Sequence, residues 1–312
     1  MRPATAGPRV PVFGAGTEVW GGIPATQIQQ SRSMPEITPA LVGQLRAMTG
    51  AGLMNCKKAL DETKGDLQAA VDILRKQGAA AAVKKADRAA NEGLIGQAVV
   101  QGGRVGVLIE VNCETDFVAR NDSFKAFVSD LANKVAAESG ADLEADRVGA
   151  VARIGENIQI RRHQRLEVQG QGLIAAYIHT GGKVGVLVEV GATKEATTGS
   201  EDFKQLVRDI TLQIAAASPV SISRDDVAAD LVEKEKEIAG QSDAVKGKPA
   251  QAVAKIIEGK LNKFFEGACL LEQGFVKNPD LKVLAHLGAL GKQLGDEITI
   301  RRFLRFQLGE PI

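Results

Sequence analysis

Apolar residues first recur at helical spacing between residues 34 and 78. Leu41, Leu45 and Met48 are four and three residues apart, and two further apolar stripes follow interruptions at residues 49–52 and 65–66. Spacings of three and four place side chains on one face of a helix. The pattern therefore predicts a three-helix domain at residues 34–78, which is small enough that its core is thin.

The segments on either side of this domain have no such stripes. Residues 79–92 are rich in Ala, Lys and Arg, which predicts a helical linker. Residues 1–33 are rich in Gly and Pro, which predicts a disordered N-terminal extension. Three origins stay open for this extension: sequence upstream of a true start at Met34, a disordered tail of the mature protein, or an organellar transit segment.

The rest of the chain contains an internal duplication. Residues 102–111 read GGRVGVLIEV and residues 181–190 read GGKVGVLVEV, with eight identities in ten. The offset between these segments also aligns flanking positions without a gap, which is the signature of a repeated structural unit. Each copy has the pattern of a strand, a Gly-Gly turn, a second strand and a helix.

A second match supplies a third strand for each copy. GENIQIRR at 155–162 resembles GDEITIRR at 295–302, and this pair is separated by a larger offset than the first pair. The second copy therefore contains an insertion between its helix and its third strand. The expected fold class is α+β, with a duplicated core of antiparallel three-stranded sheets. We expect one core subdomain at residues 93–170 and the other at residues 171–222 and 266–312.

Part of the insertion has a recognisable pattern of its own. Within residues 223–265, apolar positions at helical spacing lie on both sides of the polar stretch GQSDAVKGKP. This arrangement predicts an antiparallel helical hairpin with solvated, charged faces. One further helix is expected at residues 281–294, packed on the second copy.

Composition narrows the classes of function. The 312 residues include 39 Lys and Arg and 38 Asp and Glu, a formal net charge of +1, and aromatic residues make up only 4%. Balanced charge removes the general electrostatic argument for a nucleic acid or an anionic membrane, and scarce aromatic residues count against stacking on single strands. No apolar run approaches the roughly 18 residues that span a bilayer.

The sequence contains none of the usual motifs for disulfides, metal ions or phosphate groups. Cys56, Cys113 and Cys269 are widely spaced, and the three histidines have no paired spacing, so neither a disulfide framework nor a zinc site is predicted. No segment has the frame of a phosphate-binding loop. We therefore expect no catalytic residue, no metal ligand and no cofactor.

A comparison of the two copies points to one loop. After its second strand the first copy reads NCETDFVARN at 112–121, where the second copy reads GATKEATTGS at 191–200. The second copy therefore folds without counterparts of Thr115, Asp116 and Phe117. Two interpretations stay open: a working feature of the first copy, or a hydrophobic staple with an acid at the start of the next helix.

One histidine also differs between the copies. His179 aligns with Val100, so the fold does not require an imidazole at this position. Either His179 has a function of its own, or it is a partly exposed residue at the end of a strand.

Three segments resemble the elongation factor Ts family, the nucleotide exchange factors of the translational GTPase elongation factor Tu. They are TGAGLMNCKKALDETKGDLQAAVDILRKQG at 49–78, EVNCETDFVARN at 110–121 and GENIQIRR at 155–162, and the resemblance covers about residues 35–309. It implies that the three-helix domain is ubiquitin-associated-like and docks on the G domain of the partner. It also implies that the hairpin at 223–265 is a coiled coil.

The resemblance also implies roles for particular residues. Four form the motif associated with dislodging Mg²⁺ from the partner's nucleotide site: Thr115, Asp116, Phe117 and Val118. Four others match positions that contact the partner: Arg46, Leu53 and Met54 in the N-terminal domain and His179 in the core. Some family members continue past the final strand into a C-terminal helix, whereas this chain ends at Ile312, so we expect a weaker affinity for the partner.

The expected function is therefore promotion of GDP release from elongation factor Tu and its exchange for GTP, in the bacterial cytoplasm or, as an alternative, in an organelle. A homodimer or a two-to-two complex with the partner stays open. The alternative function is that of a ubiquitin-associated-type adaptor or chaperone, which would hold a protein through residues 37–78 without any effect on nucleotide. A nucleotide-using enzyme would need a phosphate-binding loop that the chain does not have.

Overall fold

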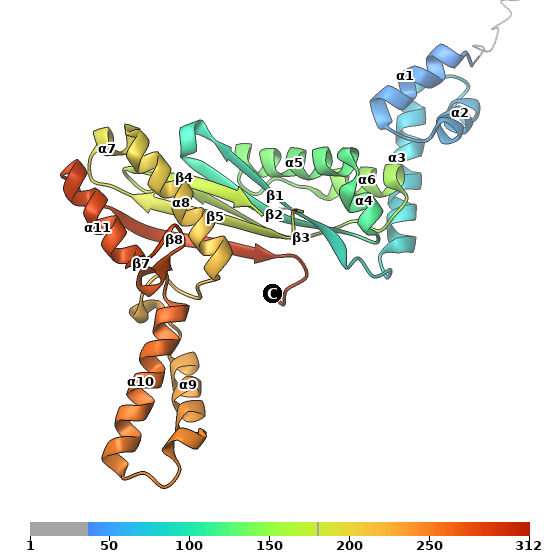
Figure 1. The fold of residues 1–312 in the computed structure, drawn as a ribbon. Helices are drawn as coiled ribbons and strands as arrows, with labels where there is room; N and C mark the ends of the chain where they lie inside the picture. The colour runs from blue at the N-terminus through green and yellow to red at the C-terminus, as the bar shows by residue number, and fades with distance from the viewer. Residues whose placement is uncertain (1–36, 180) are drawn as a thin grey trace, which may run out of the picture. The chain divides into compact units, whose positions relative to one another are not determined.

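The computed structural model describes residues 37–179 and 181–312, and its first elements are three helices (Figure 1). The extension predicted at residues 1–33 lies outside the described residues. Helices α1 (Pro39–Thr49), α2 (Leu53–Glu62) and α3 (Leu67–Lys85) follow the predicted stripes. The side chains of Thr38 and Asp66 cap α1 and α3, and the three helices enclose a small core that includes Leu45, Cys56, Leu60 and Val71.

A single helix spans the expected boundary at residue 79. Helix α3 runs on to Lys85, where the lysine Nζ donates a hydrogen bond to the carbonyl of Gly155 at 2.7 Å. Ala82, within the expected linker, is buried in the core of the first copy. The last turns of α3 therefore belong to the packed core, because helix α6 (Glu144–Ile154) lies against them.

The duplicated core consists of two matching antiparallel sheets. Strands β1 (Glu92–Val100), β2 (Val105–Cys113) and β3 (Gln159–Glu167) form the first, and β4 (Gly172–Ile178), β5 (Val184–Gly191) and β8 (Thr299–Gln307) form the second, each in that spatial order. A register shift falls at the same place in both, between Glu110 and Val111 and between Glu189 and Val190. The predicted α+β class with antiparallel three-stranded sheets is confirmed.

The helices repeat as well. A short helix and a long one follow the second strand of each copy: α4 (Asp116–Arg120) and α5 (Asp122–Ala137), then α7 (Glu195–Gly199) and α8 (Glu201–Ala217). Helix α11 (Val283–Leu294) stands at the repeat position of α6, and both end at a left-handed glycine. The sequence pattern revealed α11 but not α6, since α6 has few large apolar residues.

The two sheets pack against each other, with α5 on the outer face of the first and α8 on the outer face of the second (Figure 1). Side chains alternate along a strand, and in β2 the residues Val107 and Ile109 contact the α5 side while Leu108 faces the other sheet. Between the sheets lie apolar side chains from both copies: Ile95, Leu108, Leu166, Val168, Ile174, Leu187 and Phe306. Both faces of β2 are therefore buried, which explains its nearly unbroken apolar sequence.

Close approach of the sheets explains one glycine in each copy. A Cβ atom at Gly106 would lie 2.4 Å from Cγ2 of Ile174, and one at Gly185 would lie 2.5 Å from Cγ2 of Ile95. Real Cβ atoms do not approach so closely, so a side chain at either position would push the sheets apart. The shared motif VGVL thus contains a glycine because the other copy packs directly on it.

A buried carboxylate in each copy joins the two halves. Glu110 and Glu189 are fully buried, and each accepts hydrogen bonds from two consecutive arginines of the third strand of its own sheet. Each also accepts one from a backbone N–H of the opposite copy: Gly309 to Glu110 at 2.9 Å and Gln169 to Glu189 at 3.0 Å. The halves therefore exchange equivalent contacts, as expected for two copies related by an approximate two-fold axis.

This arrangement has a consequence for acid stability. Burial alone raises the pKa of Glu189, but hydrogen bonds from Gln169, Arg302 and Arg301 outweigh it and hold the pKa below its ordinary value of 4.5. A lowered folded-state pKa contributes stability above the unfolded-state pKa, and this contribution is lost as pH falls through the folded-state pKa. We expect Glu189→Gln to destabilise the protein at neutral pH, with a difference from wild type that shrinks below about pH 4.5. Urea unfolding across this range measures the difference, and a value independent of pH would contradict the prediction.

The insertion forms a helical hairpin followed by a small strand pair. Helices α9 (Ala229–Gln241) and α10 (Ala250–Ala268) each have one buried residue, Ala239 and Ala268. Three short 3-10 turns lie near their ends, and a two-stranded β6 (Gly274–Phe275) and β7 (Asn278–Lys282) leads into α11. Two helices occupy the part of the chain where helical spacing predicted them, although α10 runs beyond residue 265, and the strand pair was not expected.

Candidate functional site

The loop singled out by the comparison of the copies begins where β2 ends. Thr115 has an extended backbone, and its hydroxyl accepts a hydrogen bond from the Val118 N–H at 3.3 Å, which caps α4. Asn121 then caps α5 in the same way, through a bond from the Ser123 N–H at 2.9 Å. Two consecutive caps fix both ends of the short helix α4.

Helix α4 divides its side chains between the core and the solvent. Ala119 is buried and Val118 packs against the core of the first copy. Phe117, by contrast, is 82% exposed. A ring that acted as a hydrophobic staple would pack against its own helix or core, so that interpretation of Phe117 is wrong.

The second copy provides an internal reference for this position. Ala196, the counterpart of Phe117, is also exposed on α7, while Thr197 beside it is buried like the anchoring residues of α4. The fold therefore leaves this position in solvent in both copies. Only the first copy places a phenyl ring there.

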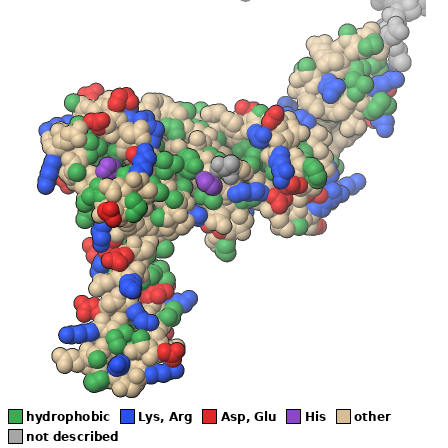
Figure 2. All heavy atoms as spheres, viewed as in Figure 1, with side chains coloured by type: hydrophobic (Ala, Val, Ile, Leu, Met, Phe, Trp, Pro, Cys, Tyr) green, Lys and Arg blue, Asp and Glu red, His purple; other side chains and the backbone are tan. Residues whose placement is uncertain are grey.

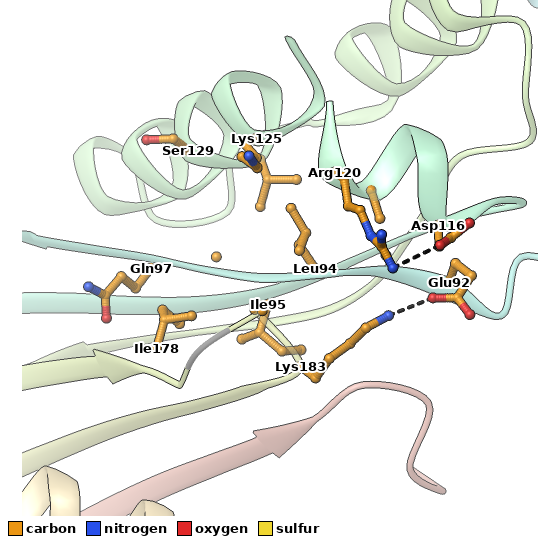
Figure 3. Close-up of a pocket in the computed structure, with 16 residues that line it drawn as sticks. Glu92, Leu94, Ile95, Gln97, Asp116, Arg120, Lys125, Ser129, Ile178 and Lys183 are labelled. Carbon is orange, nitrogen blue, oxygen red and sulfur yellow. Dashed lines mark hydrogen bonds and ion pairs between the residues drawn. The ribbon is translucent and has the colours of Figure 1, made fainter. Parts of the chain in front are cut away.

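Asp116 lies at the rim of a cavity of about 830 Å³. Its carboxylate pairs with Arg120, one turn along α4, at 3.0 Å (Figure 3). Lys183 of the second copy, which also lines the cavity, pairs with Glu92 of the first through its Nζ at 2.6 Å (Figure 3). The cavity is thus built from both copies and has an apolar floor that includes Leu94, Ile95 and Ile178.

His179 follows β4 directly and is exposed. Its Nδ1 lies 3.3 Å from the Tyr177 hydroxyl, and its sequence neighbours Ile178 and Gly181 line the same cavity as Asp116. The structure therefore brings the β4–β5 turn and the start of α4 together around one cavity. Sequence reasoning selected both segments but had no means of placing them side by side.

The other predicted contact residues lie in the three-helix domain. Arg46 is exposed, and Leu53 and Met54 are each more than half exposed at the start of α2. Met48, at the end of α1, is also more than half exposed, although its spacing had placed it on an apolar stripe. Figure 2 shows hydrophobic side chains on the surface of this domain. Exposed apolar residues therefore lie on both sides of the α1–α2 connection.

Within residues 37–179 and 181–312, no three His, Cys, Asp or Glu side chains gather in a way that could hold a metal ion. Cys56, Cys113 and Cys269 are buried and free, and burial raises the pKa of the Cys113 thiol to about 11. A thiol with so high a pKa stays protonated at neutral pH and is a poor nucleophile. Among the described helices, none is long and apolar enough to cross a membrane.

The structure is that of a duplicated α+β protein with two antiparallel three-stranded sheets, and its first copy holds a phenyl ring out into solvent. A family model described as "Elongation factor TS" matches residues 114–310. Elongation factor Ts of Trichlorobacter lovleyi is 46% identical over 292 residues, covering 88% of this chain and 94% of the relative. The protein of the same name from Syntrophotalea carbinolica is 48% identical over 292 residues, covering 89% and 94%. The chain belongs to the elongation factor Ts family.

Proposed function

We propose that this chain is a nucleotide exchange factor: it binds elongation factor Tu in its GDP form and promotes release of GDP and its exchange for GTP. The observation that carries the proposal is Phe117, which is 82% exposed on a helix capped at both ends. Membership of the elongation factor Ts family supplies the identity of the partner.

The thermodynamics of exchange follow from linkage. A factor that binds the nucleotide-free GTPase more tightly than the GDP-bound form must weaken GDP binding by the same factor. No covalent step is needed, because differential binding alone shifts the equilibrium. The factor therefore has to stabilise a conformation of the partner that holds GDP poorly.

The Mg²⁺ ion in the partner's nucleotide site is the vulnerable point. Mg²⁺ requires near-ideal octahedral geometry, with ligands at about 2.0–2.1 Å, so a small shift of its protein ligands costs much of its binding. We assign to Phe117 the role of an apolar wedge that inserts into the partner near this site. Asp116, which forms an ion pair with Arg120, is assigned a polar contact with the partner. Thr115 and Val118 anchor the wedge through the cap and the core contact.

We further propose that the three-helix domain at residues 34–78 is ubiquitin-associated-like and docks on the partner through Arg46, Leu53 and Met54. His179 is proposed to contact the partner beside the wedge, since its sequence neighbours line the same cavity as Asp116. The hairpin at residues 223–265 is proposed to be a coiled coil, supported by its two antiparallel helices α9 and α10. We place the protein in the bacterial cytoplasm. A homodimer and a two-to-two complex with the partner are the proposed assemblies, and the mass of the assembly distinguishes them.

Stopped-flow release of a fluorescent GDP analogue from elongation factor Tu tests the function. We expect release to accelerate by orders of magnitude as this chain is added, and to saturate. If the chain binds the partner but leaves the release rate unchanged, the exchange function is wrong and the adaptor alternative takes its place.

A further inference from the structure

The segment that leads into α4, the helix that carries Phe117, is hydrogen-bonded to Glu156, which lies in the connection between α6 and β3. We propose that Glu156 is a positioning residue, which fixes the wedge before it meets the partner and fastens it to the end of α3. The inference rests on the proposed exchange function and adds to it a residue outside the Thr115–Val118 motif.

Both carboxylate oxygens of Glu156 hold the loop. Oε1 accepts a hydrogen bond from the Thr115 hydroxyl at 2.6 Å, and Oε2 accepts from the N–H groups of Glu114 and Thr115 at 3.0 and 3.1 Å. Hydrogen bonds to a charged acceptor are the stronger kind. The same Thr115 hydroxyl caps α4, so Glu156 acts directly on the residue that sets the start of the wedge helix.

We call the hydrogen bonds from Glu114 and Thr115 to Glu156 the clamp. Asn157, the next residue, links this clamp to the end of α3. The Asn157 N–H donates to Oε1 of Glu114 at 2.6 Å, and its side-chain amide donates to the carbonyls of Ala86 and Arg88 at 3.3 and 2.7 Å. Asn157 is buried, so these bonds are shielded from competing water. One short segment, Gly155 to Asn157, therefore contacts both the wedge loop and the chain leaving the three-helix domain.

The second copy contains a similar clamp without a wedge: both backbone N–H bonds recur, but the hydroxyl bond comes from the counterpart of Glu114 and does not cap α7. Asp296 stands at the repeat position of Glu156 and accepts hydrogen bonds from the N–H groups of Thr193 and Lys194 at 3.1 and 3.0 Å, and from the Thr193 hydroxyl. Both copies therefore fix this loop with a carboxylate, but the loop of the second copy carries Ala196 where the first carries Phe117. Removing Asp296 is a matched control, because it loosens the corresponding loop in the copy that has no phenyl ring.

Rigidity of this loop before binding should raise the rate of GDP release, because a mobile loop would have to become ordered when Phe117 inserts into the partner. Fixing the backbone of a mobile loop costs conformational entropy, and a loop that is already fixed before binding does not incur this cost on insertion. Loss of the clamp should therefore lower the rate at which bound factor releases GDP. It should affect binding less, because the contact surface of the three-helix domain remains intact.

The test compares Glu156→Ala with Asp296→Ala in the full chain, using stopped-flow GDP release from elongation factor Tu. We expect Glu156→Ala to lower the maximal release rate at saturation by about tenfold or more, since misplacement by about 1 Å can cost up to a hundredfold. The concentration that gives half-maximal release should change less. Asp296→Ala should keep nearly the wild-type rate, and Glu156→Asp, which installs the second copy's own carboxylate, should restore most of the activity.

Hydrogen exchange at the amides of Glu114 and Thr115 in the free protein gives a readout that does not depend on the partner. Both amides should lose protection in Glu156→Ala and keep it in Glu156→Asp. If Glu156→Ala does not fold, Glu156→Gln, which keeps the shape but replaces one acceptor oxygen by an NH2 donor, takes its place in the same comparison.

Two results would overturn the inference while leaving the exchange function in place. One is a wild-type release rate for Glu156→Ala alongside a loss for Phe117→Ala. The other is an equal loss for Glu156→Ala and Asp296→Ala, which would make the clamp a matter of general stability. If the wild-type chain itself fails to accelerate release, the proposed function falls, and the role of Glu156 falls with it.

Discussion

Phe117→Ala is expected to bind elongation factor Tu and yet lose most of the acceleration of GDP release, by about a hundredfold at saturation. Full burial of a Phe side chain is worth about 1.5–3 kcal/mol, and each 1.36 kcal/mol changes a rate by a factor of ten. If the ring is buried only in the conformation that releases GDP, its whole contribution appears in the maximal rate. The measurement is stopped-flow release with increasing amounts of the variant.

The fold should tolerate this change. The ring is 82% exposed, and surface substitutions away from caps and cores usually alter stability by less than about 0.5 kcal/mol. Leu284→Ala is a matched control, because Leu284 is another exposed apolar residue, on α11 and far along the chain from the wedge. Equal losses in the two variants, or an unchanged rate for Phe117→Ala, would contradict the wedge mechanism.

The largest loss of stability is expected from Glu110→Ala. Glu110 is fully buried and pairs with Arg161 at 3.0 Å and Arg162 at 2.7 Å. Removing one partner from a buried ion pair leaves uncompensated charge and typically costs about 3–5 kcal/mol. The variant also frees the Gly309 N–H, a contact between the copies. Urea unfolding by linear extrapolation gives the difference in free energy.

A surface ion pair serves as the control for this prediction. Nζ of Lys246 lies 2.6 Å from Oδ1 of Asp243, but both side chains are largely exposed. Asp243→Ala should therefore lower the free energy of unfolding by less than about 1 kcal/mol. A similar small change for Glu110→Ala would mean that water replaces the lost carboxylate as the acceptor, or that the two arginines turn to solvent. The contact between the two halves would then be weaker than its geometry indicates.

The architecture of the core was accessible from the sequence because it is encoded twice. The repeat of GGRVGVLIEV as GGKVGVLVEV predicted two hairpins with helices, and the repeat of GENIQIRR as GDEITIRR predicted the third strands, all of which the structure contains. The difference between the two offsets locates the insertion that forms α9 and α10. Helix α6 was not predicted because it has few large apolar residues, among them Val148, Val151 and Ile154, and these leave a weak periodic signal.

The candidate site was only partly accessible. Comparison of the copies selected residues 115–117 because the second copy lacks them, but spacing alone could not separate a staple from an exposed wedge. Glu156 is absent from the residues that the sequence predicts for the site, although Gly155-Glu156 in one copy matches Gly295-Asp296 in the other. An acid shared by the two copies is the signal that points to it, but a repeated strand motif accounts for the same match.

The sequence by itself determined the local elements, the repeat and the family, because hydrophobic spacing, glycine turns and duplicated motifs are written along the chain. The tertiary structure decided which side chains face solvent and which distant segments meet. Exposure of Phe117 depends on how α4 packs on the core, and the clamp depends on Thr115 and Glu156, far apart in the sequence, being brought within hydrogen-bond distance. Such contacts arise from packing of the whole chain, so no local pattern contains them.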